Sequence, residues 1–246
     1  MTDPSTSTLP DDFGRAFITG VHETLMGAAD TLGDLDRRAG DGDFGTNITT
    51  AMKLATANIE ADEPTTYRDW ATAMYMAWLG VGGTSGPLFG MFFRDLAKAG
   101  EADADAGGAS PAGGAAPEGE VGASSVPTLA QFAEALAAGQ ATVQKYGEAE
   151  VGDKTMVDAL DPAVTTLREA ADAGKDPAAA LADAEQSAVD AAKSTAESVA
   201  RRGRASYVGD AAKGVIDPGA AAMALIIGAA RAAAAGESDV DTSWIS

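Results

Sequence analysis

The chain contains no cysteine and only one histidine among its 246 residues. Without cysteine, disulfide bonds and catalysis by a thiol are excluded. The single histidine, His22, falls within the first predicted helix and off its apolar stripe, so no Ser-His-Asp arrangement is expected. Chemistry by a nucleophile of the protein is therefore hard to assemble, whereas chemistry that positions a metal ion and a phosphate group is not.

Basic residues are also scarce, because 17 Lys and Arg stand against 37 Asp and Glu, a formal net charge of −20. Such a surface repels nucleic acid and anionic lipid, so neither is expected as a partner. The longest apolar run, near 220–227, is short and alanine-rich, so no membrane span is expected. The first residues lack a basic region followed by an apolar core, so we expect no signal peptide and a cytoplasmic protein.

What the sequence does contain is ample apolar side chain for a packed core, 46% of all residues, arranged with helical periodicity. Phe17, Val21 and Leu25, for example, share one stripe of the first segment. The last two segments both open with Asp-Pro, a pair typical of helix starts. No convincing strand and no repeat is found. We expect helices at about 11–33, 45–61, 67–78, 87–99, 128–146, 154–173, 177–201 and 218–235.

Residues 100–127 differ from the rest, since Gly, Ala, Ser, Pro and Glu dominate and large apolar residues are nearly absent. Such a segment cannot bury enough surface to offset its ordering entropy. We therefore predict one all-α domain over 11–236 that carries a flexible surface insertion at 100–127. Residues 1–10 and 237–246 are expected to be loose tails, although apolar residues near the C-terminus could dock.

An acidic, glycine-rich turn follows the first segment, in the stretch LDRRAGDGDFGTN at 35–47. It places Asp36, Asp41 and Asp43 close together just before the second predicted helix. Carboxylates on a tight turn repel one another unless a cation neutralises them, and oxygen ligands suit Mg²⁺ or Ca²⁺ rather than zinc. The following helix start offers free N–H groups to an anion. The spacing is compatible with a metal–phosphate site and with a plain surface turn.

Three further segments carry groups suited to an oxyanion. GVGGTSGP at 80–87 lets backbone N–H groups approach a ligand and adds the hydroxyls of Thr84 and Ser85, but its glycines could equally serve a tight turn between helices. GEAEVGDKTM at 147–156 places charges and an apolar Met before a helix. RRGR at 201–204 could bind an anion, or complement the dipole at the end of the seventh helix.

Four segments, read in order, cover the chain from the first helix to the last: LDRRAGDGDFGTNI (35–48), GGTSGPLFG (82–90), GDKTMVDAL (152–160), and RRGRASYVGD with VIDPGA (201–220). Together they resemble the L subunit of dihydroxyacetone kinase, the nucleotide-binding half of that enzyme. The resemblance implies a closed up-and-down barrel of eight antiparallel amphipathic helices that binds ADP or ATP with two Mg²⁺ ions at one end. It agrees with the independent count of helical segments.

The resemblance also implies the residues of the site. The metal ions would be held by Asp36, Asp41 and Asp43. Phosphate contacts would come from Gly45, Thr46, Asn47, Thr84 and Ser85, beside Phe44. The adenine pocket would be lined by Gly147 and Met156. The nucleotide site would be completed by Arg204, Asp217, Pro218 and Gly219.

Position 44 departs from the family pattern, because the kinase subunits usually carry His there. Phenylalanine cannot donate a hydrogen bond to a phosphate. We expect the Phe44 side chain to lie near the phosphates, and its identity leaves the choice of phosphoryl donor or sugar undetermined.

The resemblance implies a phosphotransferase subunit with no catalytic residue of its own, which works with a separate K subunit. That subunit binds dihydroxyacetone or a similar small ketose covalently through its own histidine. Phosphate would arrive from a phosphocarrier protein, with ADP retained as a cofactor, or from exchanging ATP. The alternatives are a nucleotide-holding regulator that contacts a transcription factor, a kinase domain for another substrate such as a fatty acid, and a purely structural barrel. GGTSGPLFG argues against the fatty-acid kinase.

Overall fold

The computed structural model describes residues 7–99, 126–202 and 212–245. Most of the predicted insertion at 100–127 therefore lies outside the described residues. Within those ranges the chain forms eight α-helices and no β-strand, which confirms the predicted all-α class. The helices are α1 (Phe13–Ala39), α2 (Phe44–Asp62), α3 (Tyr67–Leu79), α4 (Ser85–Leu96), α5 (Leu129–Gly147), α6 (Met156–Asp172), α7 (Pro177–Ser194) and α8 (Pro218–Ala235).

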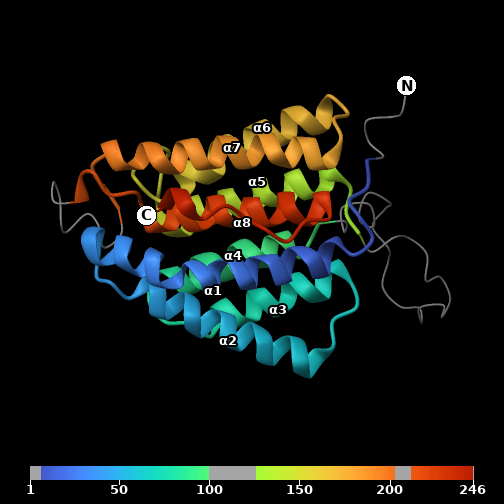
Figure 1. Ribbon diagram of the computed structural model, residues 1–246, viewed down its shortest axis with the longest axis horizontal. Helices are drawn as coiled ribbons and strands as arrows, with labels where there is room; N and C mark the ends of the chain where they lie inside the picture. The colour runs from blue at the N-terminus through green and yellow to red at the C-terminus, as the bar shows by residue number, and fades with distance from the viewer. Residues whose placement is uncertain (1–6, 100–125, 203–211, 246) are drawn as a thin grey trace, which may run out of the picture.

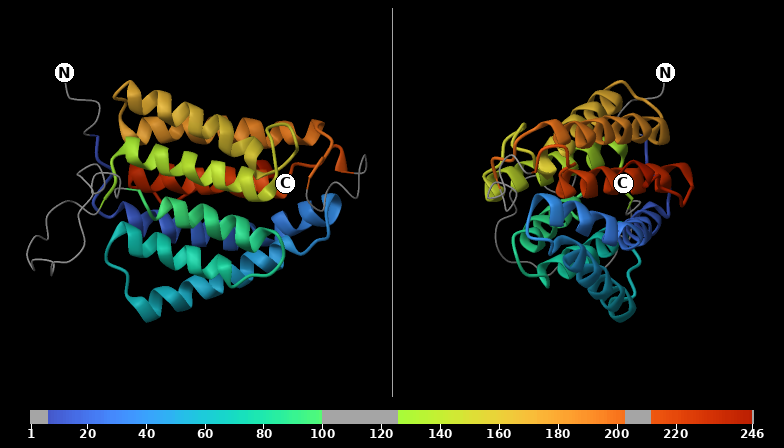
Figure 2. Two further views of the ribbon diagram at one scale, coloured as in Figure 1. Left: turned by 180° about the vertical axis from the view of Figure 1, so that it is seen from behind. Right: turned by 60° about the vertical axis from the view of Figure 1, so that its left-hand side comes forward.

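The helices run up and down around a closed ring (Figure 1). Each packs against the next in sequence, and α8 packs against α1 to close the ring, as the resemblance implied. Because successive helices alternate in direction, α2, α4, α6 and α8 all begin at one end of the ring, where α1, α3, α5 and α7 finish (Figure 2). We call this the pocket end, since the cavity described below opens there.

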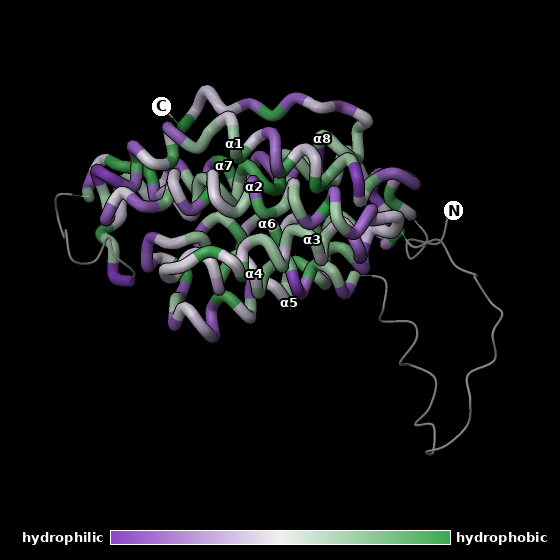
Figure 3. Tube along the Cα trace, turned by 90° about the horizontal axis from the view of Figure 1, so that it is seen from below, coloured by the Kyte–Doolittle hydropathy of each residue, from purple (hydrophilic) through white to green (hydrophobic). Residues whose placement is uncertain are grey.

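The opposite end of the ring is closed by aromatic side chains. Phe13 and Phe17 of α1 stack on each other with centroids 5.5 Å apart, and Phe132 of α5 meets both edge-on. Tyr67 stacks against Phe13, and its hydroxyl donates to the carbonyl of Leu96 at 3.1 Å. Hydrophobic stretches concentrate in the middle of the bundle and hydrophilic ones toward its edges (Figure 3).

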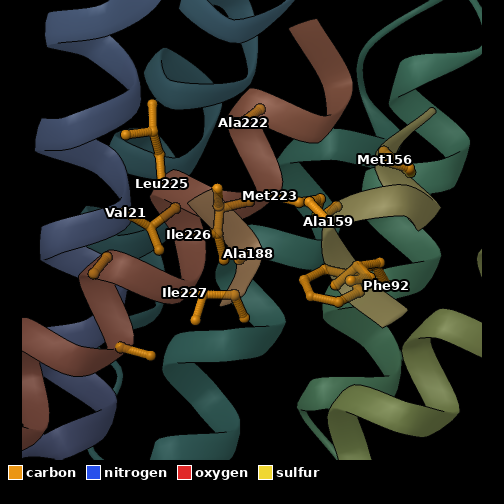
Figure 4. Close-up of a cluster of buried hydrophobic side chains, with 14 of the residues drawn as sticks. Val21, Phe92, Met156, Ala159, Ala188, Ala222, Met223, Leu225, Ile226 and Ile227 are labelled. Atoms are coloured by element: carbon orange, nitrogen blue, oxygen red, sulfur yellow. The ribbon is translucent and has the colours of Figure 1, made fainter. Parts of the chain in front are cut away.

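Helix α8 supplies the centre of this core. It is apolar nearly all round, with Arg231 as its single charged residue, and Met223, Leu225, Ile226 and Ile227 are fully buried. Figure 4 shows these side chains lying beside Val21 of α1, Ala159 of α6 and Ala188 of α7. By length and composition α8 could also cross a membrane, but 78% of it is buried inside the protein, as in the central helix of a folded core.

Two predicted helix ends are wrong, and both lie beside the pocket end. α1 continues to Ala39, so Asp36 lies on the last turn of a helix rather than on the glycine turn. α7 finishes at Ser194 and is followed by a short 3-10 turn, Thr195–Glu197. Arg202 therefore lies well beyond α7 and does not complement its dipole.

Both chain ends, expected to be loose, are packed where the structure describes them. Leu9 is buried, and its N–H donates to the carbonyl of Pro127 at 3.2 Å. The segment after α8 runs back along the bundle to the pocket end (Figure 1). There Ile245 is buried, and the ring of Trp244 lies 5.7 Å from the ammonium of Lys193 on α7.

Glycine lets α1 and α2 approach closely just inside the pocket end. A Cβ added to Gly45 would lie 2.5 Å from the carbonyl oxygen of Ala29 and 3.1 Å from the Cα of Gly33. The two helices can lie this close because no side chain separates them. The contact fixes the position of the acidic turn that joins them.

Replacing Gly45 with alanine should lower the free energy of unfolding by about 1–3 kcal/mol, since the added methyl must push two backbones apart. Gly27→Ala is the matched control, because Gly27 lies inside α1 and nothing comes within 4 Å of its Cβ. That substitution should raise stability by about 0.5–1 kcal/mol. Urea unfolding measures both; equal stabilities would show that the α1–α2 contact is loose.

Candidate functional site

A cavity of about 450 Å³ opens at the pocket end, a size suited to a nucleotide-sized ligand. Its walls come from the last turns of α1 and α5, the first turns of α2, α4, α6 and α8, and the loops between them. Residues far apart in sequence therefore meet here. Of the predicted site residues, the cavity is lined by Asp36, Asp41, Asp43, Phe44, Asn47, Thr84, Ser85, Gly147, Met156, Asp217, Pro218 and Gly219.

Four helix starts border this cavity. Phe44, Ser85, Met156 and Pro218 are the first residues of α2, α4, α6 and α8, and each one lines the wall. The first turn of a helix has backbone N–H groups without intrahelical partners and the positive end of the helix dipole. Together the four starts create a region suited to an anion in a chain of net charge −20.

Carboxylates stand beside these helix starts. The Asp36 carboxylate accepts the N–H of Phe44 at 3.0 Å, and Asp41 accepts the N–H of Asp43 at 3.3 Å. Burial raises the pKa of the Asp36 carboxyl, the N–H of Phe44 opposes this, and the charge of Asp41 raises the pKa further. A cation placed between these groups would relieve their repulsion.

The donor set of this corner fits a hard divalent ion that is shared with a ligand. All its side-chain donors are carboxylate oxygens, which suit Mg²⁺. In the described part of the chain, no three His, Cys, Asp or Glu side chains converge closely enough to hold an ion by themselves. Mg²⁺ is commonly held by one or two carboxylates together with phosphate oxygens, so an incomplete protein cage is compatible with it.

The glycine-rich segment between α3 and α4 both lines the cavity and forms a tight turn between the two helices. Gly82 and Gly83 line the cavity, and Gly83 has a φ of +76° that favours glycine. Gly86 serves packing instead, since a Cβ there would lie 2.0 Å from the carbonyl oxygen of Val81. The Asn47 amide donates to the hydroxyl of Ser85 at 3.1 Å, which joins the starts of α2 and α4.

One side of the cavity is apolar, as is usual in pockets that bind a small molecule. Its lining includes Leu88, Val143 and Met156. Phe44 is buried, and its ring lies 5.7 Å from that of Phe89. Phe44 therefore belongs to the cavity floor and the core rather than reaching freely into the cavity.

A family model described as the DAK2 domain matches residues 38–232 of the chain. The chain belongs to this family.

The DAK2 domain described here is similar to a bacterial kinase subunit over nearly its full length. It is 32% identical over 209 residues to the ADP-binding subunit DhaL of the PEP-dependent dihydroxyacetone kinase of Escherichia coli, covering 84% of this chain and 89% of that subunit. It is 33% identical to the L-erythrulose 1-kinase of Mycolicibacterium smegmatis, covering 80% of this chain and 31% of that protein. The chain thus spans about a third of the longer curated relatives.

A solved structure shares the fold. This is the dihydroxyacetone kinase of C. freundii in complex with AMP-PNP and Mg²⁺, with a TM-score of 0.62 and 23% identity. The match covers 93% of this chain and 35% of that one.

Two of the predicted site residues, Gly45 and Thr46, are not among the residues that line the main cavity of this DAK2 domain. They line a smaller hollow of about 250 Å³ between α1 and α2, and their contact with a ligand stays a prediction. Gly45 faces α1 because the two helices cross there. Arg204 lies outside the described residues.

Among the lining residues that were not predicted as site residues, two are charged, Lys154 and Arg202. Lys154 borders the cavity although it is only 1% exposed. The Arg202 guanidinium lies 3.6 Å from the carboxylates of Glu148 and of Asp153. Both residues fall in segments that the sequence had singled out for their charge, and that was the available signal.

Asp217 is the N-cap of α8 and the most perturbed acid of the DAK2 domain pocket. Its carboxylate accepts the N–H of Ala220 at 2.7 Å, and its own N–H donates to the hydroxyl of Thr195 at 2.8 Å. Burial raises the pKa of Asp217 to about 7, although the N–H of Ala220 and the charge of Lys154 act against this rise.

This pKa makes the stability of the domain depend on pH. The folded protein binds the Asp217 proton more tightly than the unfolded chain, whose pKa is near 3.8, so this group's stabilising contribution is lost as pH rises from about 4 through 7. An asparagine side chain at this position would keep the cap without titrating. Asp217→Asn should therefore gain stability relative to wild type across that window, by a few kcal/mol at most.

Urea unfolding between pH 4.5 and 8, about the range of this transition, without Mg²⁺ or nucleotide, measures the difference. Asp176→Asn is the matched control, because Asp176 is the solvent-exposed N-cap of α7 and also precedes a proline. A stability difference between wild type and Asp217→Asn that stays constant with pH would contradict the raised pKa.

Proposed function

We propose that this chain is the nucleotide-binding L-type subunit of a kinase for dihydroxyacetone or a related small ketose. The observation that carries the proposal is the meeting of four helix starts and three carboxylates at one cavity. Helix starts favour phosphate, and carboxylates favour the divalent ion that accompanies it. The E. coli relative is named an ADP-binding subunit, which supports ADP or ATP as the ligand.

The two sides of the cavity suit the two ends of a nucleotide. The apolar side, with Val143, Gly147 and Met156, would hold the adenine. The starts of α2 and α4, with Asn47 and Ser85, would hold the phosphates. Asp36, Asp41 and Asp43 would bind Mg²⁺, with two ions as the resemblance implies, and bound Mg²⁺ would neutralise the phosphate oxygens. The protein would act by positioning and charge neutralisation.

The chain would transfer phosphate only together with other proteins. The cavity offers no histidine or cysteine among the described residues that line it, so a ketose would be presented by a separate K-type subunit. The PEP-dependent E. coli relative favours a phosphocarrier protein as donor, with ADP retained as a cofactor. The L-erythrulose kinase relative supports related ketoses and exchanging ATP as the second candidate. Such a system operates in the cytoplasm.

Asp41→Asn and Asp43→Asn should each weaken ADP binding in the presence of Mg²⁺ by about 10–100-fold or more, because each removes an ionic oxygen ligand. Calorimetry with ADP, with Mg²⁺ and again with EDTA, measures this. Asp34→Asn is the matched control, since Asp34 pairs with Arg37 on the outside of α1 and does not line the cavity. Unchanged affinity in both turn variants would remove the metal assignment.

Alone, the chain should not phosphorylate dihydroxyacetone with ATP or with a phosphocarrier. Turnover should appear when a K-type subunit and a phosphoryl donor are both added, because the K subunit supplies the substrate-holding histidine that this cavity lacks among its described residues. A coupled assay that follows dihydroxyacetone phosphate measures it. Turnover by this chain without a partner would refute the proposal that it needs a separate K-type subunit.

A further inference from the structure

Lys154 is buried at the edge of the cavity, with its ammonium group in a cage of backbone carbonyls. The ammonium donates to the carbonyl oxygens of Ala212 and Val215, both at 2.8 Å, and of Ser198 at 3.2 Å. An ammonium has three donors, and all three are used here. Lys154 therefore cannot also donate to a ligand in the cavity while this cage is intact.

The backbone around Lys154 is held in an unusual conformation. Lys154 has a φ of +64°, a left-handed value that side chains other than glycine rarely adopt. The backbone carbonyl of its neighbour Asp153 accepts the N–H of Arg201 at 3.0 Å. Burial lowers the pKa of the Lys154 ammonium, and the nearby charge of Asp217 opposes this. A strained backbone and a buried charge persist only where the surroundings compensate them.

The carbonyl cage connects two walls of the cavity. Lys154 directly precedes Thr155 and Met156, which line one wall. The carbonyls that it binds belong to residues 198, 212 and 215 of the connection between α7 and α8, which also carries the lining residues Arg202 and Asp217. Arg202 follows the bonded carbonyl of Ser198 by four residues, and Asp217 follows that of Val215 by two, so one ammonium holds both described parts of this connection.

We propose that Lys154 is a positioning residue whose ammonium acts as a built-in monovalent cation, holding the described residues 198–202 and 212–217, and with them Arg202 and Asp217, in place at the cavity. Rings of backbone carbonyls bind K⁺ in the same manner, by replacing its hydration shell. The part of this inference that is tested by nucleotide binding rests on the proposed function.

Two substitutions separate the charge from the packing. Lys154→Met removes the charge and keeps most of the volume, whereas Lys154→Ala removes the charge and leaves the cage open. Both should weaken ADP–Mg²⁺ binding by about 10–100-fold, the usual effect of losing a group that orients a binding shell. Potassium or ethylammonium chloride should restore affinity to Lys154→Ala but not to Lys154→Met, and tetramethylammonium chloride should restore neither.

Lys213→Met is the matched control for charge. Lys213 is exposed in the same segment, and within the described residues its side chain makes no hydrogen bond or ion pair. It should bind ADP–Mg²⁺ nearly as wild type does. A loss as large as that of Lys154→Met would show that general electrostatic attraction, not the cage, explains the effect and would overturn the proposal.

Hydrogen exchange gives a readout that needs no nucleotide. The amides of Arg201 and Gly214, which donate to Asp153 and Ala196, should exchange faster in Lys154→Met, while amides at the aromatic end of the ring keep wild-type rates. Wild-type protein that fails to bind ADP would refute the proposed function while leaving this test intact. Wild-type exchange and affinity in Lys154→Met would overturn the cage proposal.

If Lys154→Met does not fold, Lys154→Arg replaces it in the same measurements. A planar guanidinium keeps the charge but cannot place three donors in the same cage. It should show weaker ADP binding than wild type and faster exchange of the amides of Arg201 and Gly214. Wild-type affinity and exchange in this variant would equally overturn the proposal.

Discussion

Closure of the helical ring by α1 and α8 is the constraint on which the rest of the structure depends. With an even number of alternating helices in a closed ring, every second helix must begin at the same end. That end gathers the positive ends of four helix dipoles, and the opposite end can be filled by the rings of Phe13, Phe17, Tyr67 and Phe132. The position of the region suited to an anion thus follows from topology before any single side chain is considered.

The same topology explains why acids and phosphate-binding groups lie side by side. Asp36 occupies the last turn of α1, where the helix dipole disfavours a negative charge. Arg37 and Arg38 in the same turn are positively charged, but they do not line the cavity. Its carboxylate instead faces the start of α2 through Phe44. An acid between one helix end and another helix start is balanced best when a cation and an anion arrive together, and a metal–nucleotide complex supplies both.

Much of the fold and of the site could be predicted from the sequence, because local signals agree with the final packing. The Asp-Pro pair at Asp217 marks a helix start, and the apolar spacing predicts all eight helices. The end of α7 could not be predicted, because no glycine or proline follows Ser194 for several residues and the chain beyond it is held by bonds to distant residues, such as those that join Thr195 to Asp217 and Ser198 to Lys154. A surface lysine and a caged one look alike in sequence.

The glycines show the same limit of prediction from the sequence. Gly45 and Gly83 both stand in segments that fit phosphate contact, yet only Gly83 lines the main cavity, while Gly45 allows two helices to touch. Nothing in the local pattern separates a glycine that admits a ligand from one that admits a neighbouring backbone, since both need only the absence of a side chain. The distinction depends on which helix crosses at that position.

The seam between α1 and α8 also has a consequence for how the chain folds. The two helices are neighbours in space, but the whole of the intervening chain separates them in sequence, so their contact carries a high cost in loop entropy. α8 is the most apolar helix, and it leaves the ribosome last of the eight. Until it arrives, the inner faces of α1, α6 and α7 lack their central partner and stay open to water. The ring therefore becomes a barrel only after α8 has been synthesised, and its cavity, which needs the start of α8 as one wall, is completed in the same step.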